Sequence, residues 1–170
     1  MPTFSFTLVQ KIEAHSEQIA DQVVDAIVRD PELREMRALH RDELSRRARD
    51  LLGNLGHWLV ARDPEVAKWS EPLGHTRFQQ SIPLCELIRG IQIVKEKLID
   101  FARAGMAGTA LQIYAEGELE YQVGRFFDAV VYYAAKGYET ALRDSTRDHS
   151  RTLRAAAAGA LDAEPGPRPA

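Results

Sequence analysis

The segment from Gly124 to Glu139 constrains the fold more than any other part of this sequence. Its aromatic and aliphatic residues recur at three- and four-residue steps, which places them on one wide face of an α-helix. These residues are Phe126, Phe127, Val130, Val131, Ala134 and Tyr138, with Ala141 and Leu142 continuing the pattern and Tyr132 and Tyr133 widening it. A helix apolar over so much of its circumference must contact other helices on two sides. We therefore predict an all-α protein that forms a homodimer.

The helix that contains this segment is predicted to be long. No proline occurs between Thr109 and Leu153, and at about 1.5 Å per residue a continuous helix there would extend beyond its own domain. Three further helices are expected, and they cover residues 7–29, 42–62 and 81–104. We expect one domain over residues 1–145, followed by the end of the long helix and a disordered Ala/Pro-rich tail over residues 146–170.

The least regular stretch of the sequence is residues 63–82. It contains Pro64, Pro72 and Gly74, which favour turns over long helices. We predict that it forms a loop, and loops positioned by a rigid scaffold often carry function. Ser81 is expected to be the N-cap of the helix that follows.

Composition and charge indicate a cytoplasmic protein. The formal net charge is −3, and the sequence has neither a signal peptide nor an apolar run long enough to span a membrane. Its one cysteine, Cys85, cannot form an internal disulfide and is expected to be a small buried core residue. Mild acidity gives no reason to expect nucleic acid, and the arginines near Arg47 are interpreted as a solvated helix face.

Motifs that carry chemistry are missing from the sequence. It contains no glycine-rich phosphate-binding loop, no Cys-x-x-Cys pair and no Gly-x-Ser-x-Gly element. The Glu-x-x-His pairs of helical di-iron sites are absent as well. We therefore expect no catalytic residues, no metal site and no enzymatic activity.

Three segments share their order and spacing with one known family. They are residues 69–91 (WSEPLGHTRFQQSIPLCELIRGI), 124–128 (GRFFD) and 136–139 (KGYE). Together they resemble the N-terminal sensor domain of RsbR-type stressosome co-antagonists, a domain type also found in front of bacterial histidine kinases and other output modules. The similarity covers about residues 7–142.

The resemblance implies a globin-like helical bundle without haem, forming a dimer that passes a signal to a protein partner in a bacterial stress or two-component-type pathway. The matching positions are His75, Arg77, Pro83, Leu87, Phe126, Phe127, Asp128, Gly137, Tyr138 and Glu139, and most of them suggest architecture. His75 and Arg77 either fix the predicted loop to a helix end or contact a ligand. No output domain is expected in this chain, because it becomes proline-rich soon after Leu161.

A globin-like fold raises the question of haem. A haem globin needs an axial histidine past the middle of the chain, but the helices predicted after residue 82 contain no histidine before His149. His57 and His75 are the only histidines near an expected pocket. We therefore predict no cofactor, with haem binding kept as an alternative.

A second functional hypothesis is a carrier or regulator with a small apolar ligand in its core. The candidate ligand-binding residues are Trp58, Trp69, His75, Arg77, Phe78, Tyr114 and Tyr121. The competing interpretation of these aromatic residues is ordinary core packing.

The predicted dimer contact pairs the first helix with the last. Its centre is expected at Leu8, Ile12, Ile19, Phe127 and Val131. Gly137 lies beside Tyr138 on the crowded face, where a side chain would separate helices. We therefore expect tight packing around Gly137.

Overall fold

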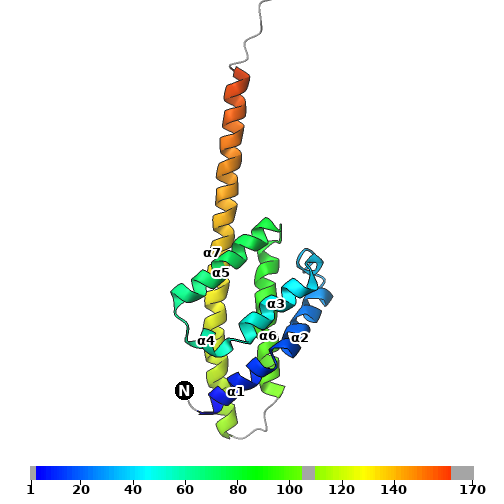
Figure 1. Cartoon of the computed structure of the whole chain (residues 1–170), viewed down its shortest axis with the longest axis vertical. Coiled ribbons are helices and arrows are strands. Elements are labelled where there is room, and N and C mark those ends of the chain that lie inside the picture. Colours follow the sequence, from blue (N-terminus) through cyan, green and yellow to red (C-terminus); the bar gives the residue numbers. More distant parts are fainter. Residues whose placement is uncertain (1–2, 105–109, 162–170) are drawn as a thin grey trace, which may run out of the picture.

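The computed structural model describes residues 3–104 and 110–161, and within these ranges every regular element is helical (Figure 1). The helices are α1 (Thr3–Ala14), α2 (Ser16–Arg29), the 3-10 helix η1 (Met36–Ala38), α3 (Arg41–Leu52), α4 (Leu55–Val60), α5 (Asp63–Gln79), α6 (Leu84–Ala104) and α7 (Ala110–Leu161). α5 and α6 pack on α7, while α2 packs on α3 and α6. The predicted all-α class is confirmed.

The core forms where the apolar faces of these helices meet. On α7 the buried residues recur at the predicted three- and four-residue steps, and they include Val123, Phe126, Phe127, Val130 and Ala134. On α2, Ile19, Val23 and Ile27 are buried with the same spacing. Full burial of one such side chain stabilises the fold by roughly 1.5–3 kcal/mol.

Two predicted helices are each broken in two. The helix expected over residues 7–29 breaks at His15, whose φ of −111° and ψ of 18° leave the helical region and whose Nδ1 donates to the carbonyl oxygen of Lys11. The helix expected over residues 42–62 breaks at Gly53 and Asn54. The apolar pattern continues across both breaks because the residues on either side face the same core.

The prediction of an irregular loop over residues 63–82 is wrong, because most of this stretch forms α5. Pro64 lies in the first turn, where no backbone donor is required. Pro72 lies inside the helix, which is disfavoured by about 3 kcal/mol. Extensive packing of α5 on α7 outweighs this penalty.

The crossing of α5 and α7 depends on two glycines, one on each helix. Gly74 lies against the backbone of Ala134, and Gly137 lies against the backbone of Glu71. A Cβ atom at either position would overlap a carbonyl oxygen of the opposite helix. The predicted tight packing around Gly137 is therefore confirmed.

The turn between α5 and α6 differs from the prediction in two places. Ser81 has a φ of 59° and lies outside the helix, which begins at Leu84, so it is not the N-cap. Cys85 is exposed rather than buried, because it lies on the outer side of the first turn of α6. The hydroxyl of Tyr138 donates to the carbonyl oxygen of Ile82 at 3.0 Å, which fixes this turn to α7.

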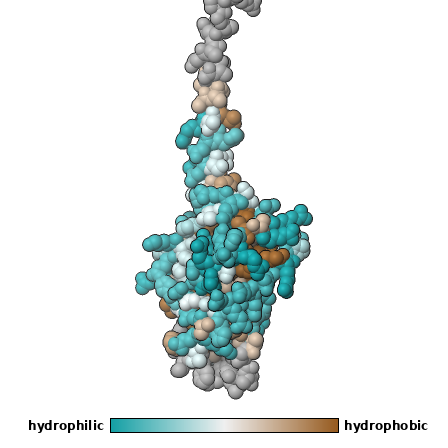
Figure 2. Space-filling model, turned by 45° about the vertical axis from the view of Figure 1, so that its right-hand side comes forward, coloured by the Kyte–Doolittle hydropathy of each residue, from teal (hydrophilic) through white to brown (hydrophobic). Residues whose placement is uncertain are grey.

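α7 continues well past the body of the protein (Figure 1). Up to residue 158, where the description of burial ends, Ala141 is the last buried residue of α7, and residues 142–158 are all exposed. At about 1.5 Å per residue, residues 142–161 extend roughly 30 Å beyond the body. Figure 2 shows that this extension is mainly hydrophilic, with isolated hydrophobic residues. The predicted long helix is confirmed, whereas the tail predicted to be disordered lies outside the described residues.

Four of the five residues predicted at the centre of a dimer contact are buried within the single chain. Leu8, Ile12, Ile19 and Phe127 are 8, 0, 0 and 2 % exposed. Val131 is half-buried and packs against the same core. The choice of Leu8, Ile12, Ile19 and Phe127 as interface residues is therefore wrong, because helices of the same chain already cover their apolar surface.

Candidate ligand cavity

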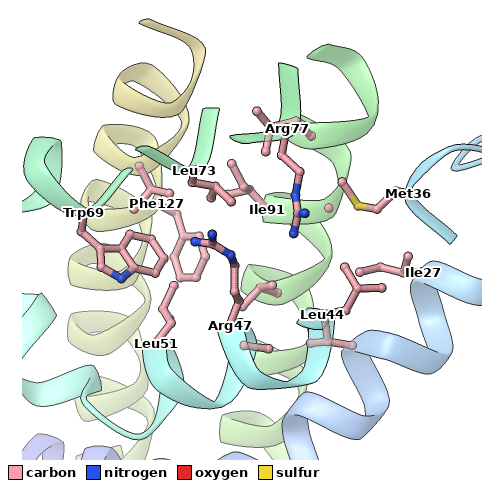
Figure 3. A pocket seen from close by; sticks show the side chains of 16 residues that line it. Ile27, Met36, Leu44, Arg47, Leu51, Trp69, Leu73, Arg77, Ile91 and Phe127 are labelled. Atoms are coloured by element: carbon pink, nitrogen blue, oxygen red, sulfur yellow. The ribbon is translucent and has the colours of Figure 1, made fainter. Parts of the chain in front are cut away.

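A cavity of about 70 Å³ lies in the core of the bundle, where α2, α3, α5, α6 and α7 converge (Figure 3). Most of its walls are aliphatic or aromatic. The lining residues include Ile27, Leu51, Trp69, Ile91, Phe127 and Val130. Met36 closes one side next to Gly90, and the Glu86 carboxylate positions Met36 by accepting from its backbone N–H at 2.8 Å.

Two arginines break the apolar lining. Arg47 extends from α3 and Arg77 from the end of α5, so that their guanidinium groups enter the cavity from opposite sides (Figure 3). Arg77 is 3 % exposed and donates through Nη1 to the side chains of Glu43 and Gln80. Arg47 has no hydrogen bond or ion pair with any other described residue, and its Nε is buried without a partner.

The electrostatics follow from this unequal pairing. Burial would raise the pKa of Glu43, but hydrogen bonds from Arg77 and Gln80 and the charges of Arg77 and Arg47 outweigh it and hold that pKa below its usual range. Burial and the neighbouring Arg77 charge lower the pKa of Arg47. The cavity therefore receives two guanidinium groups, and one of them has no carboxylate in direct contact.

A wall of aromatic rings separates the cavity from a groove on the surface. Phe127 on the cavity side contacts Phe126 at 5.2 Å between ring centroids, and Phe126 stacks on Trp58 at 6.0 Å. The groove has a volume of about 520 Å³, and Trp58 and Tyr121 lie along it. Trp69, which lines the cavity, lies 5.4 Å from Trp58.

The structure divides the predicted ligand-binding residues among several places. Two of them, Trp69 and Arg77, line the cavity, whereas Trp58 and Tyr121 line the groove. The Phe78 ring packs edge-on against Tyr138 at 5.4 Å. The other two, His75 and Tyr114, are exposed. The seven residues therefore do not form one site.

Arg47 is the functional candidate that sequence reasoning missed. It was interpreted as part of a solvated basic face, yet it is half-buried and lines the cavity. A signal was present, since Arg47 lies three residues after Leu44 and four before Leu51, both of which are buried. A charged residue at the spacing of an apolar stripe lies on the side of the helix that faces the core.

The cavity does not fit haem. Pockets for ligands of cofactor or drug size have volumes of about 300–1,000 Å³, several times larger than this one. Neither His57 nor His75 lines it, and both are exposed. Within residues 3–104 and 110–161, no group of three or more His, Cys, Asp or Glu residues is placed to hold a metal ion.

Over the same described ranges, no helix has both the length and the apolar character that a membrane crossing requires. No curated protein matches the chain. Among solved structures, the globin domain of DosC from E. coli, described as a ferric form, is similar with a TM-score of 0.64. It is 13 % identical, and the match covers 80 % of this chain and 90 % of that one, so it shows a globin-like fold.

The sequence comparison reaches the same family as the three segments identified in the sequence. The model of the RsbT co-antagonist protein rsbRD N-terminal domain matches residues 17–165, which is most of the chain. The chain therefore belongs to the family of RsbT co-antagonist protein rsbRD N-terminal domains.

Proposed function

We propose that this protein is a haem-free, globin-like sensory module that pairs with a second copy and acts on a protein partner in a bacterial stress or two-component-type pathway. Its family and its fold support a sensory role in stress signalling. The family description names RsbT, and a component of such a pathway is the partner we propose. In this proposal the module acts in the cytoplasm by binding and not by catalysis.

The observation that carries the proposal is a stripe of exposed apolar side chains on α7. Tyr114, Tyr121, Tyr132, Leu142 and Leu153 are 68, 63, 64, 47 and 57 % exposed. These five fall on one heptad frame, with Tyr132 and Leu153 at a and the other three at d. Ile113, which is 61 % exposed on the same helix, lies at c and outside the stripe. Helices that present such a stripe associate as coiled coils.

The position of this stripe connects the core to the outside of the protein. One face of α7 lines the cavity through Phe127 and Val130, while the stripe follows its solvent side into the extension. Polar residues such as Glu139 and His149 occupy other a and d positions. We expect the dimer to be parallel and weak. It is weak because a parallel pair places the two Glu139 carboxylates opposite each other, where they repel.

Cysteine cross-linking on a Cys85→Ser background tests this pairing. Thr146 lies at an a position and Arg147 at the neighbouring b position, and both are exposed. In a parallel dimer Thr146→Cys should form an intermolecular disulfide on mild oxidation, because equivalent a positions lie within the Cα separation of about 4.4–6.8 Å that a disulfide needs. Arg147→Cys should not.

Equal cross-linking of both variants would contradict the heptad frame. A wild-type protein that sediments only as a monomer at tens of micromolar would refute the dimer. The alternative, a carrier or regulator with a small apolar ligand, is restricted to very small ligands by a core cavity of only about 70 Å³.

A further inference from the structure

We propose that the core cavity is a binding site for a small monocarboxylate anion of acetate or propionate size, held between Arg47 and Arg77. This inference rests on the sensory role proposed above and names the class of ligand. Both guanidinium groups line the cavity, and they enter it from opposite sides (Figure 3). The space between them is the place for a negatively charged group.

The first argument is a guanidinium group that has no carboxylate in direct contact among the described residues. Glu43 pairs with Arg77 but does not itself line the cavity. Arg47 has a buried Nε with no acceptor, and among the described residues no carboxylate lies within ion-pair distance of it. A buried donor without an acceptor is unfavourable, and arginine remains charged in proteins. A bound anion would supply the missing acceptor and the missing charge.

The second argument is the chemistry of the remaining walls. Leu51, Ile91, Phe127 and Val130 present only carbon atoms to the cavity. A phosphate or sulfate group needs donors around its whole circumference, and apolar walls would leave several of its oxygens without partners. A carboxylate has two oxygens on one side, which suit two arginines, and its alkyl group suits the apolar walls.

The third argument is size. At about 70 Å³, the cavity is several times smaller than the pockets of about 300–1,000 Å³ that hold drug-sized ligands. Acetate and propionate are correspondingly small. A long alkyl chain or a ring system would require the helices to separate.

The position of the site links ligand binding to the position of α7. A ligand that contacts Arg47 on α3 and Arg77 on α5 would draw these two helices together. α5 is the helix that crosses α7 at Gly74 and Gly137, where backbone lies against backbone. A movement of α5 at this crossing has no flexible side chain to absorb it, so it should reach α7.

Isothermal titration calorimetry with sodium propionate, against sodium chloride at equal ionic strength, tests the proposal. Wild-type protein should bind propionate in a saturable manner. Arg47→Met should weaken binding about tenfold or more, because a charge-assisted hydrogen bond is lost. The matched control is Arg46→Met, which removes an exposed arginine of the same helix and should bind like wild type.

A second variant keeps both arginines and changes only the space. Val130→Leu should reduce affinity for propionate more than for acetate, because it fills part of the cavity. If Arg47→Met does not fold, this shift in the acetate-to-propionate ratio still decides the matter. An unchanged ratio would place any bound carboxylate outside the cavity and overturn the proposal.

Three further results of the titrations would contradict the proposed binding site. No binding by wild type, equal binding by Arg47→Met, or equal binding of chloride and propionate would each overturn the proposal. Sedimentation of the same samples separates this inference from the proposed function. A dimer that does not bind propionate would refute only the ligand, and a monomer that binds it would refute only the pairing.

Discussion

Replacement of Gly137 by alanine should destabilise the protein although alanine is the better helix former. The new Cβ would overlap the carbonyl oxygen of Glu71 and lie 2.8 Å from the carbonyl carbon and Cα of that residue. These are backbone atoms, so no rotamer change can relieve the overlap and the two helices must move apart. Such overpacking destabilises by roughly 1–3 kcal/mol, and we take the upper end because backbone is involved.

The gain in helix propensity opposes this loss. Glycine to alanine within a helix is favourable by about 1 kcal/mol, which leaves a net destabilisation of roughly 2 kcal/mol. For a chain of this size that corresponds to a melting temperature about 4–8 °C lower. Thermal unfolding followed by far-ultraviolet circular dichroism measures the difference.

Gly117 provides the matched control on the same helix. A Cβ atom there would meet no other atom within 4 Å. Gly117→Ala should therefore raise the melting temperature by about 2–4 °C, since only the propensity gain of about 1 kcal/mol applies. If Gly137→Ala melts at or above the wild-type temperature while Gly117→Ala behaves as expected, the close contact of α5 and α7 is refuted.

Three further predictions follow from the same structure. Leu142→Lys should dissociate the proposed dimer in analytical ultracentrifugation without loss of helicity. Arg147→Glu lies at b, breaks only an exposed pair with Asp144 and should leave assembly unchanged; dissociation by both variants would argue against the stripe. Glu43→Gln should lower the free energy of unfolding at neutral pH and make it less dependent on pH in the acid range. The pKa of Glu43 in the folded state is below the ordinary 4.5, so its carboxylate contributes stability above pH 4.5 that is lost as the pH falls through the folded-state pKa. An unchanged acid profile in urea unfolding would contradict the pairing of Glu43 with Arg77. The protein should purify colourless, and added haem should give no sharp Soret band in an absorbance scan; a band that is lost on replacing either His57 or His75 would contradict this prediction.

The local sequence pattern was sufficient to predict a helix that packs one face against the core. The apolar spacing over residues 124–139 predicted both the helix and its burial, because the residues that recur at helical spacing are the ones that face the core. The absence of proline predicted the length of α7, and Gly137 beside Tyr138 predicted the tight contact. Membership of the family could be predicted too, from segments whose order does not depend on the fold.

Other features depended on contacts between distant parts of the chain. The local sequence around Pro72 and Gly74 predicts a loop, yet both residues lie within α5, because packing of α5 against α7 outweighs their weak helix propensity. Leu8 and Ile12 are apolar enough for an interface, but only the packed structure shows that the same chain covers them. Periodicity identifies an apolar face and does not identify what covers it.

The cavity is the clearest example of the difference between what the sequence determined and what the tertiary structure decided. The sequence by itself determined an all-helical bundle and the positions along each helix that face inward, because these depend on neighbouring residues. Only the tertiary structure decided that Arg47 and Arg77, thirty residues apart in the chain, enter one cavity. Among the described residues, the one carboxylate paired with either of them is that of Glu43, which contacts Arg77. Charge balance inside a protein depends on distances between helices, and no local pattern in the sequence records those distances.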